Sequence, residues 1–292
     1  MLLRSPAARP TRFVLVADDF GMTQGVSRSI LALLEAGRLT GAGVMANMPW
    51  ASRLGRELAA HAGLADLGLH LNLTLGRPLG PMPALCPGGA LPSFGALARL
   101  ALAGGASRHA VAAELAAEID RQVDAYAEAV GRLPDYVDGH QHVQVLPGVR
   151  SALLDAVARR PGWRPWLRDS GDRLGAILVR GVAAPKALVI AGLSLGFARS
   201  ARRAGLETNE GFSGVSPFDP TRDFGADFAR FLAVPGPRHL VMCHPGLGDD
   251  DELARLDPVV ATRPQEHAFL SGSHFLEVLA EARMALARFG EL

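Results

Sequence analysis

Four short motifs, far apart along the chain, bring metal-binding or proton-handling side chains to what we predict to be the ends of strands. They are residues 16–21 (VADDFG), 68–72 (GLHLN), 138–142 (DGHQH) and 242–246 (MCHPG). Three of the four follow an apolar, β-prone run, and a glycine or proline lies in or beside every one. Barrel-type α/β enzymes place catalytic groups from several strands on one rim in this way. This arrangement constrains the fold more than any other feature of the sequence.

Strand-like runs and helix-like patterns alternate along the chain. The predicted strands are residues 12–17, 42–46, 64–71, 136–138, 166–168, 207–215 and 239–243. The predicted helices are residues 24–36, 51–62, 107–130, 148–158, 222–232 and 273–288. Such alternation implies parallel strand pairing with right-handed crossovers. We therefore expect an α/β fold with a single domain at residues 12–292, a (β/α) barrel of about seven strands, after a disordered N-terminal tail at residues 1–11.

Two segments interrupt this alternation. Residues 75–92 hold five prolines and several glycines, so we predict an irregular loop there. A loop of this length is usually a functional lid or a substrate wall, although a tolerated surface insertion is the alternative. Residues 174–204 are predicted to be irregular or weakly helical, because glycine and proline recur in them. Their apolar part, residues 187–195, could form a subunit interface, as in a homodimer, or a wall for an apolar part of a substrate.

The composition argues against several classes of function. The chain has 292 residues, 49% of them hydrophobic, which is enough to bury a substantial core. Its net charge of +1, from 30 basic and 29 acidic residues, gives no indication of a nucleic-acid partner. Two cysteines are too few for a disulfide scaffold, and we find no apolar run long enough for a membrane span. We therefore expect a soluble, cytoplasmic protein.

Asp18 and Asp19 directly follow a run that is typical of a buried strand. Adjacent carboxylates repel each other, and both would be costly at a strand end without compensation. A divalent cation would compensate one of them and leave the other to act as a base toward water. The alternative is an ordinary exposed acidic turn, since Asp-Asp pairs are common.

Histidines supply the other candidate ligands. His70 lies in the apolar run of residues 67–71, where a core or rim histidine with satisfied hydrogen bonds is the alternative. His140 and His142 are two residues apart, so on an extended segment they would share one face, together with Asp138. Such a pair can provide one ligand and a second group that orients it or contacts a substrate.

His244 follows the predicted strand at residues 239–243 and precedes a proline and a glycine. This position suits a general acid or a group that stabilises an oxyanion. A set of aspartates and histidines is typical of a hydrolytic metal site that keeps an open position for water. Each motif alone is weak evidence, but four of them between residues 18 and 244 predict a metal-dependent hydrolase.

Taken together, the motifs resemble those of the YdjC-like carbohydrate deacetylases, which include chitooligosaccharide deacetylases and hopanoid-associated deacetylases. The matching segments, in chain order, are residues 17–21 (ADDFG), Asn47, and residues 68–71 (GLHL), 138–142 (DGHQH), 211–213 (GFS) and 243–245 (CHP). The resemblance covers about residues 12–275. It implies a distorted (β/α) barrel related to polysaccharide deacetylases, and removal of an acetyl group from an N-acetylated sugar.

The resemblance also implies roles for particular residues. The implied ligands of one divalent metal ion, Mg²⁺ or Zn²⁺, are Asp19, His70 and His140. Asp18 resembles the catalytic base of the family and His244 its general acid. The residues implied to bind the substrate or to orient a ligand are His142, Asp138, Arg168, Asn47 and Phe212. Of these, Arg168 is placed to keep Asp18 ionised.

The chain departs from the chitooligosaccharide type at two positions, because Gln141 and Gln144 stand where histidines are found there. This difference concerns the substrate more than the chemistry. Two further alternatives stay open at this point. The same metal site could hydrolyse a different amide, an ester or a phosphoester. The chain could also be a non-catalytic sugar-binding protein, although a binding protein has no need of both a water site and an acid.

Overall fold

The structure is a computed structural model that describes residues 10–102, 106–248 and 250–292. Most of the predicted disordered tail, residues 1–9, lies outside the described residues, and Thr11 already belongs to the first strand. In the described part of the chain the strands are β1 (Thr11–Phe20), β2 (Gly41–Val44), β3 (Asp66–Leu71), β4 (Tyr136–Gly139), β5 (Trp166–Leu167), β6 (Phe212–Ser213), β7 (His239–Cys243) and β8 (Met284–Leu286).

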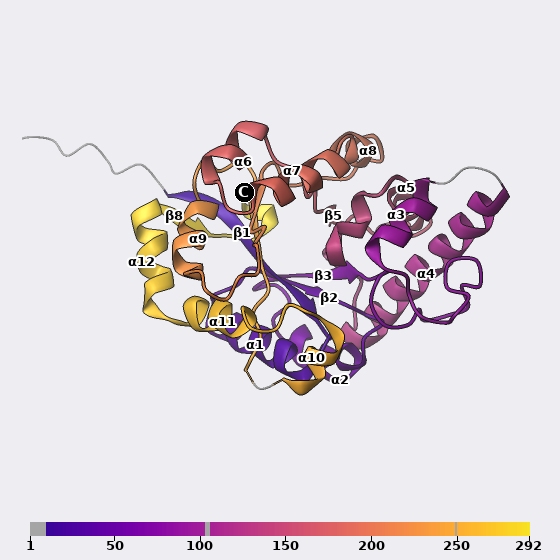
Figure 1. Ribbon diagram of the computed structural model, residues 1–292, viewed down its shortest axis with the longest axis horizontal. Coiled ribbons are helices and arrows are strands. Elements are labelled where there is room, and N and C mark those ends of the chain that lie inside the picture. Colours follow the sequence, from indigo (N-terminus) through magenta and orange to yellow (C-terminus); the bar gives the residue numbers. More distant parts are fainter. Residues whose placement is uncertain (1–9, 103–105, 249) are drawn as a thin grey trace, which may run out of the picture.

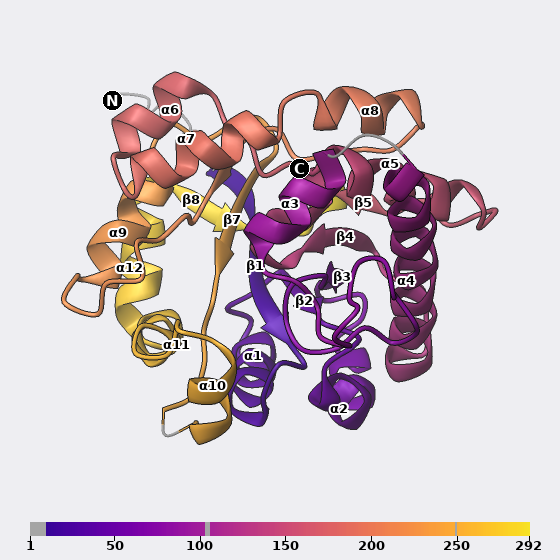
Figure 2. The same ribbon diagram turned by 45° about the vertical axis from the view of Figure 1, so that its right-hand side comes forward.

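Helices surround these strands (Figure 1). The α-helices are α1 (Gln24–Glu35), α2 (Pro49–Ala59), α3 (Phe94–Leu102), α4 (Ala106–Val130), α5 (Pro147–Ala158), α6 (Leu174–Arg180), α7 (Ala184–Leu193), α8 (Phe197–Arg203), α9 (Phe224–Phe231), α10 (Asp251–Leu256), α11 (Arg263–Ser271) and α12 (Ser273–Ala282). Two 3₁₀ helices, η1 (His140–Val145) and η2 (Phe289–Glu291), complete the described elements. Figure 2 shows α6, α7 and α8 lying together across one end of the strands.

The strands form one sheet of parallel pairs in the order β5-β4-β3-β2-β1-β7-β6, with β8 beside the beginning of β1. A bridge between Leu167 of β5 and Thr208, shortly before β6, brings the two edges of the sheet together. The sheet therefore curls into a distorted barrel. This confirms the predicted α/β class and the predicted count of about seven strands.

Strand β1 runs through the centre of the core. Phe13, Leu15 and Ala17 pack in the larger apolar cluster, whereas Val14 and Val16 pack in a second, smaller cluster. Because successive side chains of a strand point to opposite faces, β1 is buried on both sides. This double burial explains why the sequence there is continuously apolar, and it places the carboxyl end of β1, with Asp18 and Asp19, inside the molecule.

The segment at residues 174–204 is more helical than predicted. It forms α6, α7 and α8, and its glycines and proline lie at helix ends: Gly181 is the C-cap of α6, Pro185 is in the first turn of α7, and Gly196 is the N-cap of α8. Glycine and proline favour these end positions. The residues that we took for interruptions therefore separate three short helices.

The predicted helix at residues 273–288 is too long. Helix α12 ends at Ala282, and its C-cap Arg283 has a φ of 53°, in the left-handed region. Strand β8 follows and pairs with Thr11–Phe13 of β1. Pairing with a distant strand here overrides the local helical pattern. Helices α3, α10 and α11 were not predicted at all.

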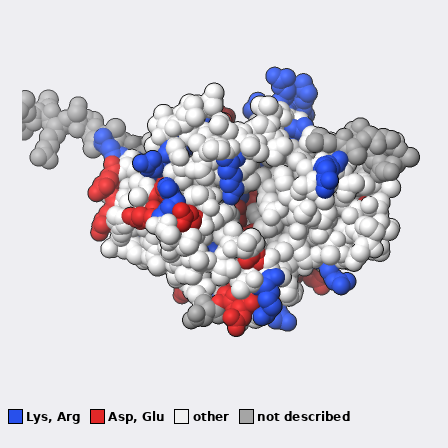
Figure 3. All heavy atoms as spheres, in the orientation of Figure 1, with Lys and Arg blue, Asp and Glu red and all other residues white. Residues whose placement is uncertain are grey.

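The face of the molecule in Figure 3 carries small mixed groups of acidic and basic side chains around a largely uncharged area. This distribution agrees with the balanced charge of the sequence. Among the residues that the structure describes, no helix combines the length and the apolar character that crossing a bilayer requires.

Substitution of Gly68 tests how closely the interior of the barrel is packed. A Cβ atom at this position of β3 would overlap the ring of Tyr136 on β4. We expect Gly68→Ala to lower the free energy of unfolding by about 1–3 kcal/mol, as overpacking of a core does. Chemical denaturation measures this change. The matched control is Gly175→Ala in α6, where a Cβ atom meets nothing within 4 Å. An equal effect of the two substitutions would contradict the packing argument.

Candidate active site

The carboxyl end of β1 departs from regular strand geometry. The register with β2 shifts between Ala17 and Phe20, and Asp19 has a φ of 72°. Adjacent residues of a regular strand point to opposite faces, but a bulge can redirect a side chain. As a result, Asp18 and Asp19 both line one cavity. In a regular strand, only one of these two adjacent carboxylates could face the cavity. The irregular end of β1 lets both of them face it.

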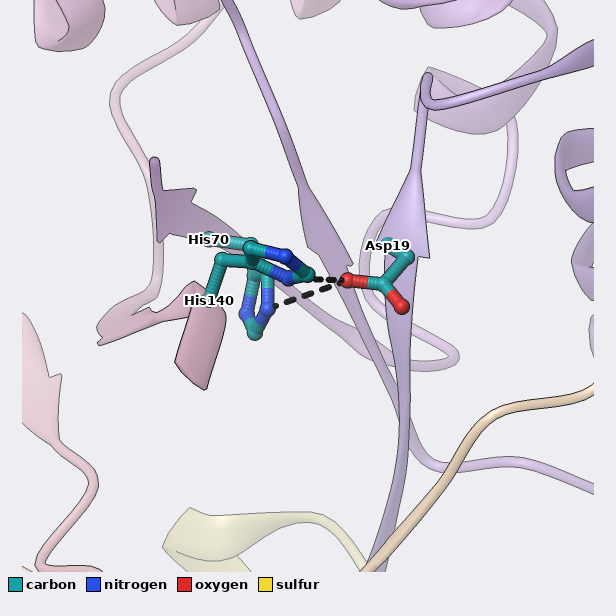
Figure 4. Close-up of side chains that lie close together, drawn as sticks. All are labelled: Asp19, His70 and His140. Atoms are coloured by element: carbon teal, nitrogen blue, oxygen red, sulfur yellow. Dashed lines mark hydrogen bonds and ion pairs between the residues drawn. The ribbon is translucent and has the colours of Figure 1, made fainter. Parts of the chain in front are cut away.

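Asp19, His70 and His140 converge from β1, β3 and η1 (Figure 4). The Oδ1 atom of Asp19 lies 2.9 Å from His140 Nδ1 and 3.3 Å from His70 Nε2. One ligand atom from each residue lies within 4.8 Å of the others, and all three side chains are buried. Donor atoms around a cation bonded at about 2.0–2.2 Å are roughly 3.0–3.5 Å apart, so this donor set fits a divalent metal ion.

Asp138 orients His70 from the neighbouring strand. The two residues are directly paired in the register of β3 and β4, and His70 Nδ1 lies 2.7 Å from Asp138 Oδ1. With Nδ1 engaged, Nε2 is free to face Asp19, as in many carboxylate–histidine–metal arrangements. The sequence placed Asp138 on one face with His140 and His142, whereas the imidazole that it contacts in the structure is that of His70. Cross-strand register, which the sequence does not display, decides the partner.

The prediction that His140 and His142 share a face of an extended segment is wrong. Strand β4 ends at Gly139, and Gln141 and His142 have φ values of 54° and 62°. His142 thereby turns against the ring of Phe212, with ring centroids 5.7 Å apart, while it still lines the cavity. Burial lowers the pKa of His142 to about 3, so its imidazole is neutral at physiological pH.

Arg168 holds Asp18 in the position that the resemblance implied. Its Nη1 and Nη2 atoms donate to the two carboxylate oxygens of Asp18 at 2.7 and 2.6 Å, and Nη2 also lies 2.5 Å from Asp138 Oδ2. Burial raises the pKa of Asp18, but Arg168, together with His70 and His244, outweighs burial and brings that pKa to about 2. Asp18 is therefore ionised and fixed in a two-pronged pair.

His244 follows β7, and its Nε2 atom lies 3.9 Å from Asp18 Oδ2. The ring of Phe218 packs edge-on against it with centroids 5.2 Å apart, and Phe218 itself has a φ of 55°. Burial lowers the pKa of His244 to about 4. The imidazole is therefore neutral in the neutral pH range, and it can take up and release a proton beside Asp18.

Sequence reasoning missed three residues of the site, all from the chain between α10 and the first turn of α11. Arg263 Nη2 donates to Asp19 Oδ2 at 2.7 Å and lies 2.9 Å from Asp257 Oδ2. Glu266 Oε2 accepts a hydrogen bond from the His244 backbone at 2.6 Å. Nothing in the local sequence marks these residues, because α11 was not predicted and Asp19, the partner of Arg263, lies 244 residues away.

The charges in this buried network do not cancel. Its aspartates are Asp18, Asp19, Asp138 and Asp257, and its arginines are Arg168 and Arg263. Four carboxylates against two guanidinium groups leave two negative charges before His70 is counted, and one negative charge if His70 is protonated. Burial lowers the pKa of His70, but the Asp138 and Asp18 carboxylates outweigh burial and raise that pKa to about 10. The site thus attracts positive charge, which a divalent cation would supply.

The cavity around these groups has a volume of about 590 Å³, within the usual range for small-molecule sites. Its apolar walls are Phe94, Val189, Ile190, Leu193, Phe218, Met242 and Val259. Part of the apolar segment at residues 187–195 therefore faces the cavity, as one of the two interpretations of that segment required. Lys186 also lines the cavity, and its Nζ donates to the Ser216 carbonyl at 3.2 Å.

The loop at residues 75–92 contributes no residue to the walls of this cavity, contrary to the prediction of a lid or substrate wall. The loop is instead attached to α4, where the buried Glu118 accepts from Leu79 N at 2.9 Å. Asn47 belongs to the same attachment, because its Nδ2 donates to the Arg77 carbonyl at 3.0 Å and its Oδ1 accepts from Asn72. Asn47 is likewise absent from the cavity walls.

Comparison with known proteins agrees with this arrangement. A family model described as YdjC-like protein matches residues 12–281. A carbohydrate deacetylase of Geobacillus stearothermophilus is 37% identical over 141 residues, 48% of this chain and 53% of that relative. A chitooligosaccharide deacetylase of Enterobacter sp. (strain 638) is 33% identical over 150 residues, 50% of this chain and 56% of that relative. The chain spans about half the length of the curated relatives it matches.

A solved structure shares the fold along almost the whole chain. It is the structure of a candidate cellobiose-phosphate cleavage protein from Enterococcus faecalis, with a TM-score of 0.70. The alignment covers 97% of this chain and 98% of that one, at 18% sequence identity. At this identity the similarity concerns the fold alone.

Substitution of Arg168 tests whether this arginine offsets the charge of the buried carboxylates. We expect Arg168→Met to lower the free energy of unfolding by about 3–5 kcal/mol, because it leaves two buried carboxylates without their partner. Chemical denaturation in the presence of a chelator measures this change without a contribution from metal binding. The control is Arg159→Met, which removes a surface pair with Asp120 in which the Arg159 side chain is 47% exposed. It should cost less than about 1 kcal/mol. Similar losses in both variants would contradict the argument.

Proposed function

The chain belongs to the YdjC-like family, and we propose that it is a metal-dependent hydrolase that removes the acetyl group from an N-acetylated amino sugar. The products are acetate and a free amine, and the sugar is part of an oligosaccharide or a glycolipid. The observation that carries the proposal is the convergence of Asp19, His70 and His140 in one cavity, beside Asp18 and His244. The names of the related deacetylases support the choice of reaction.

Asp19, His70 and His140 hold one divalent cation in this proposal. One carboxylate and two imidazoles favour zinc or another transition ion over magnesium, because imidazole is a softer ligand than carboxylate or water. When bound, the cation supplies Lewis acidity that polarises the acetyl carbonyl and lowers the pKa of water. In this proposal Asp138 accepts a hydrogen bond from His70 Nδ1, which leaves His70 Nε2 as the ligand atom.

Asp18 is the base. It accepts a proton from the water molecule whose oxygen forms the new bond to the acetyl carbon. Arg168 binds both carboxylate oxygens, so Asp18 enters the reaction ionised and correctly oriented. Pre-orientation of this kind lowers the entropic part of the barrier.

His244 delivers a proton to the amine nitrogen as the bond between carbon and nitrogen breaks. Because the pKa of His244 is lowered to about 4, the imidazole does not bring this proton from the resting state at neutral pH. It takes up the proton that Asp18 has received from water, across the 3.9 Å between Asp18 Oδ2 and His244 Nε2. The proton lost by water is then the one gained by the leaving amine, and the reaction is balanced.

Metal binding is tested by titrating chelator-treated protein with Zn²⁺ and, separately, Mg²⁺ in a calorimeter. We expect one site per chain, with a lower dissociation constant for Zn²⁺. Replacement of a ligand by His70→Ala should abolish binding, and Asp138→Asn should weaken it about 10- to 100-fold, as loss of a group that orients a ligand does. His267→Ala, at a histidine that does not line the cavity, is the control and should leave affinity unchanged. Absence of binding by the wild type would exclude the proposed function.

Turnover is tested by acetate release from a panel of N-acetylated mono- and oligosaccharides. Asp18→Asn should bind Zn²⁺ yet lose about 10²–10⁴-fold in rate, because it removes the base and leaves the ligands in place. Full activity of the wild type after exhaustive chelation would contradict the mechanism. Release of a product other than acetate would favour a different hydrolase, and saccharide binding without any hydrolysis would favour a non-catalytic binding protein.

A further inference from the structure

We propose that the first turn of α11 positions both halves of the site, Arg263 holding the ligand Asp19 and Glu266 holding His244. This inference rests on the proposed function, because it assigns positioning residues to the metal ligand and to the proton donor. It goes beyond that function by linking metal affinity and proton delivery to one helical turn that contains neither a ligand nor a group reacting with the substrate.

Arg263 is fixed on three sides. Its side chain is 1% exposed, Nε donates to the Val259 carbonyl at 2.9 Å, and Nη2 lies between Asp19 Oδ2 at 2.7 Å and Asp257 Oδ2 at 2.9 Å. Arg263 thus occupies one oxygen of Asp19 and leaves Oδ1 facing His70 and His140. Asp19 has a positive φ, a backbone conformation that persists only where the surroundings enforce it, and the pair with Arg263 is one such restraint.

Glu266 fixes the other half of the site through the backbone. Its carboxylate is buried, and Oε2 accepts a hydrogen bond from His244 N at 2.6 Å. His244 follows the last residue of β7, so the strand no longer fixes its position. The bond from Glu266 therefore takes over this role and sets the distance between the His244 imidazole and Asp18.

The body of α11 is well anchored for this purpose. Arg263 and Glu266 are three residues apart and so lie on the same face of the helix. The Arg263 carbonyl accepts a hydrogen bond from Gly246 N at 3.1 Å, which ties the helix to the chain just after His244. The helix also packs against α1, α9 and α12. A rigid helix thus connects two groups that would otherwise move independently.

The test compares Zn²⁺ affinity with kcat for two groups of full-length variants. Arg263→Met should weaken Zn²⁺ binding about 10- to 100-fold, and Asp257→Asn should do so to a smaller extent, because Arg263 then loses one anchor. Glu266→Met should leave Zn²⁺ affinity within about twofold of wild type but lower kcat at saturating Zn²⁺ about 10- to 100-fold, as misplacement of a reacting group does. Glu266→Gln, which keeps an acceptor oxygen, should restore most of kcat.

Gln265→Ala, on the same helical turn but bonded to the Pro220 carbonyl, is the matched control and should change neither quantity. A merely structural role would lower both quantities together in every variant, and that result would overturn the proposal. So would wild-type Zn²⁺ affinity in Arg263→Met, or failure of Glu266→Gln to restore kcat. If wild-type protein binds no Zn²⁺, the proposed function itself fails. If it binds Zn²⁺ and only the variants depart from expectation, the failure belongs to α11 alone.

Discussion

Two ionised carboxylates lie side by side at the buried end of β1, and the remainder of the site follows from the need to compensate them. Each has its own arginine: Arg168 binds Asp18 and Arg263 binds Asp19. Removing one partner of a buried pair is costly, whereas a satisfied network fixes its members in one geometry. Because further carboxylates flank both arginines, the network keeps an excess of negative charge. The arginines therefore do not neutralise all of the carboxylate charge, and the remaining negative charge favours the binding of a cation.

The barrel makes this network possible by bringing remote segments to one edge. The parallel pairing of β1, β2, β3 and β4 places the ends of these strands next to one another, so residues more than a hundred positions apart come within bonding distance. Helices contribute the cavity wall and the contacts that restrain the side chains at the strand ends. Helix α7 adds apolar wall to the cavity, and α11 reaches Asp19 from the far end of the chain. Strands position the groups that would react, and helices restrain them.

The sequence predicted the parts of the fold and site that depend on local pattern. The apolar run before Asp18 predicted β1, and polar residues at strand ends predicted a shared site. The resemblance to the family implied the set of Asp19, His70 and His140, which lie together in the structure. What it missed depends on register and on long-range contact. The pairing of Asp138 with His70 follows from strand register, and the left-handed backbone at His142 follows from the end of β4. Arg263 carried no signal, because an arginine in an unpredicted helix looks like any surface charge until its buried partner is known.

Non-glycine residues with positive φ recur around the cavity, at Asp19, Gln141, His142 and Phe218. Each such conformation costs on the order of 1–3 kcal/mol and persists only where the surroundings enforce it. The rim of the cavity therefore stores energy that the regular part of β1, residues 12–17, does not. Upon warming, the native ensemble should first open at this rim, well below global unfolding. Amide protons there would exchange with solvent while those of residues 12–17 in β1 stay protected. Evolution of such a protein toward heat resistance would then have to change residues of the cavity rim. Substitutions that make the rim more rigid would also affect catalysis, because the same residues line the cavity.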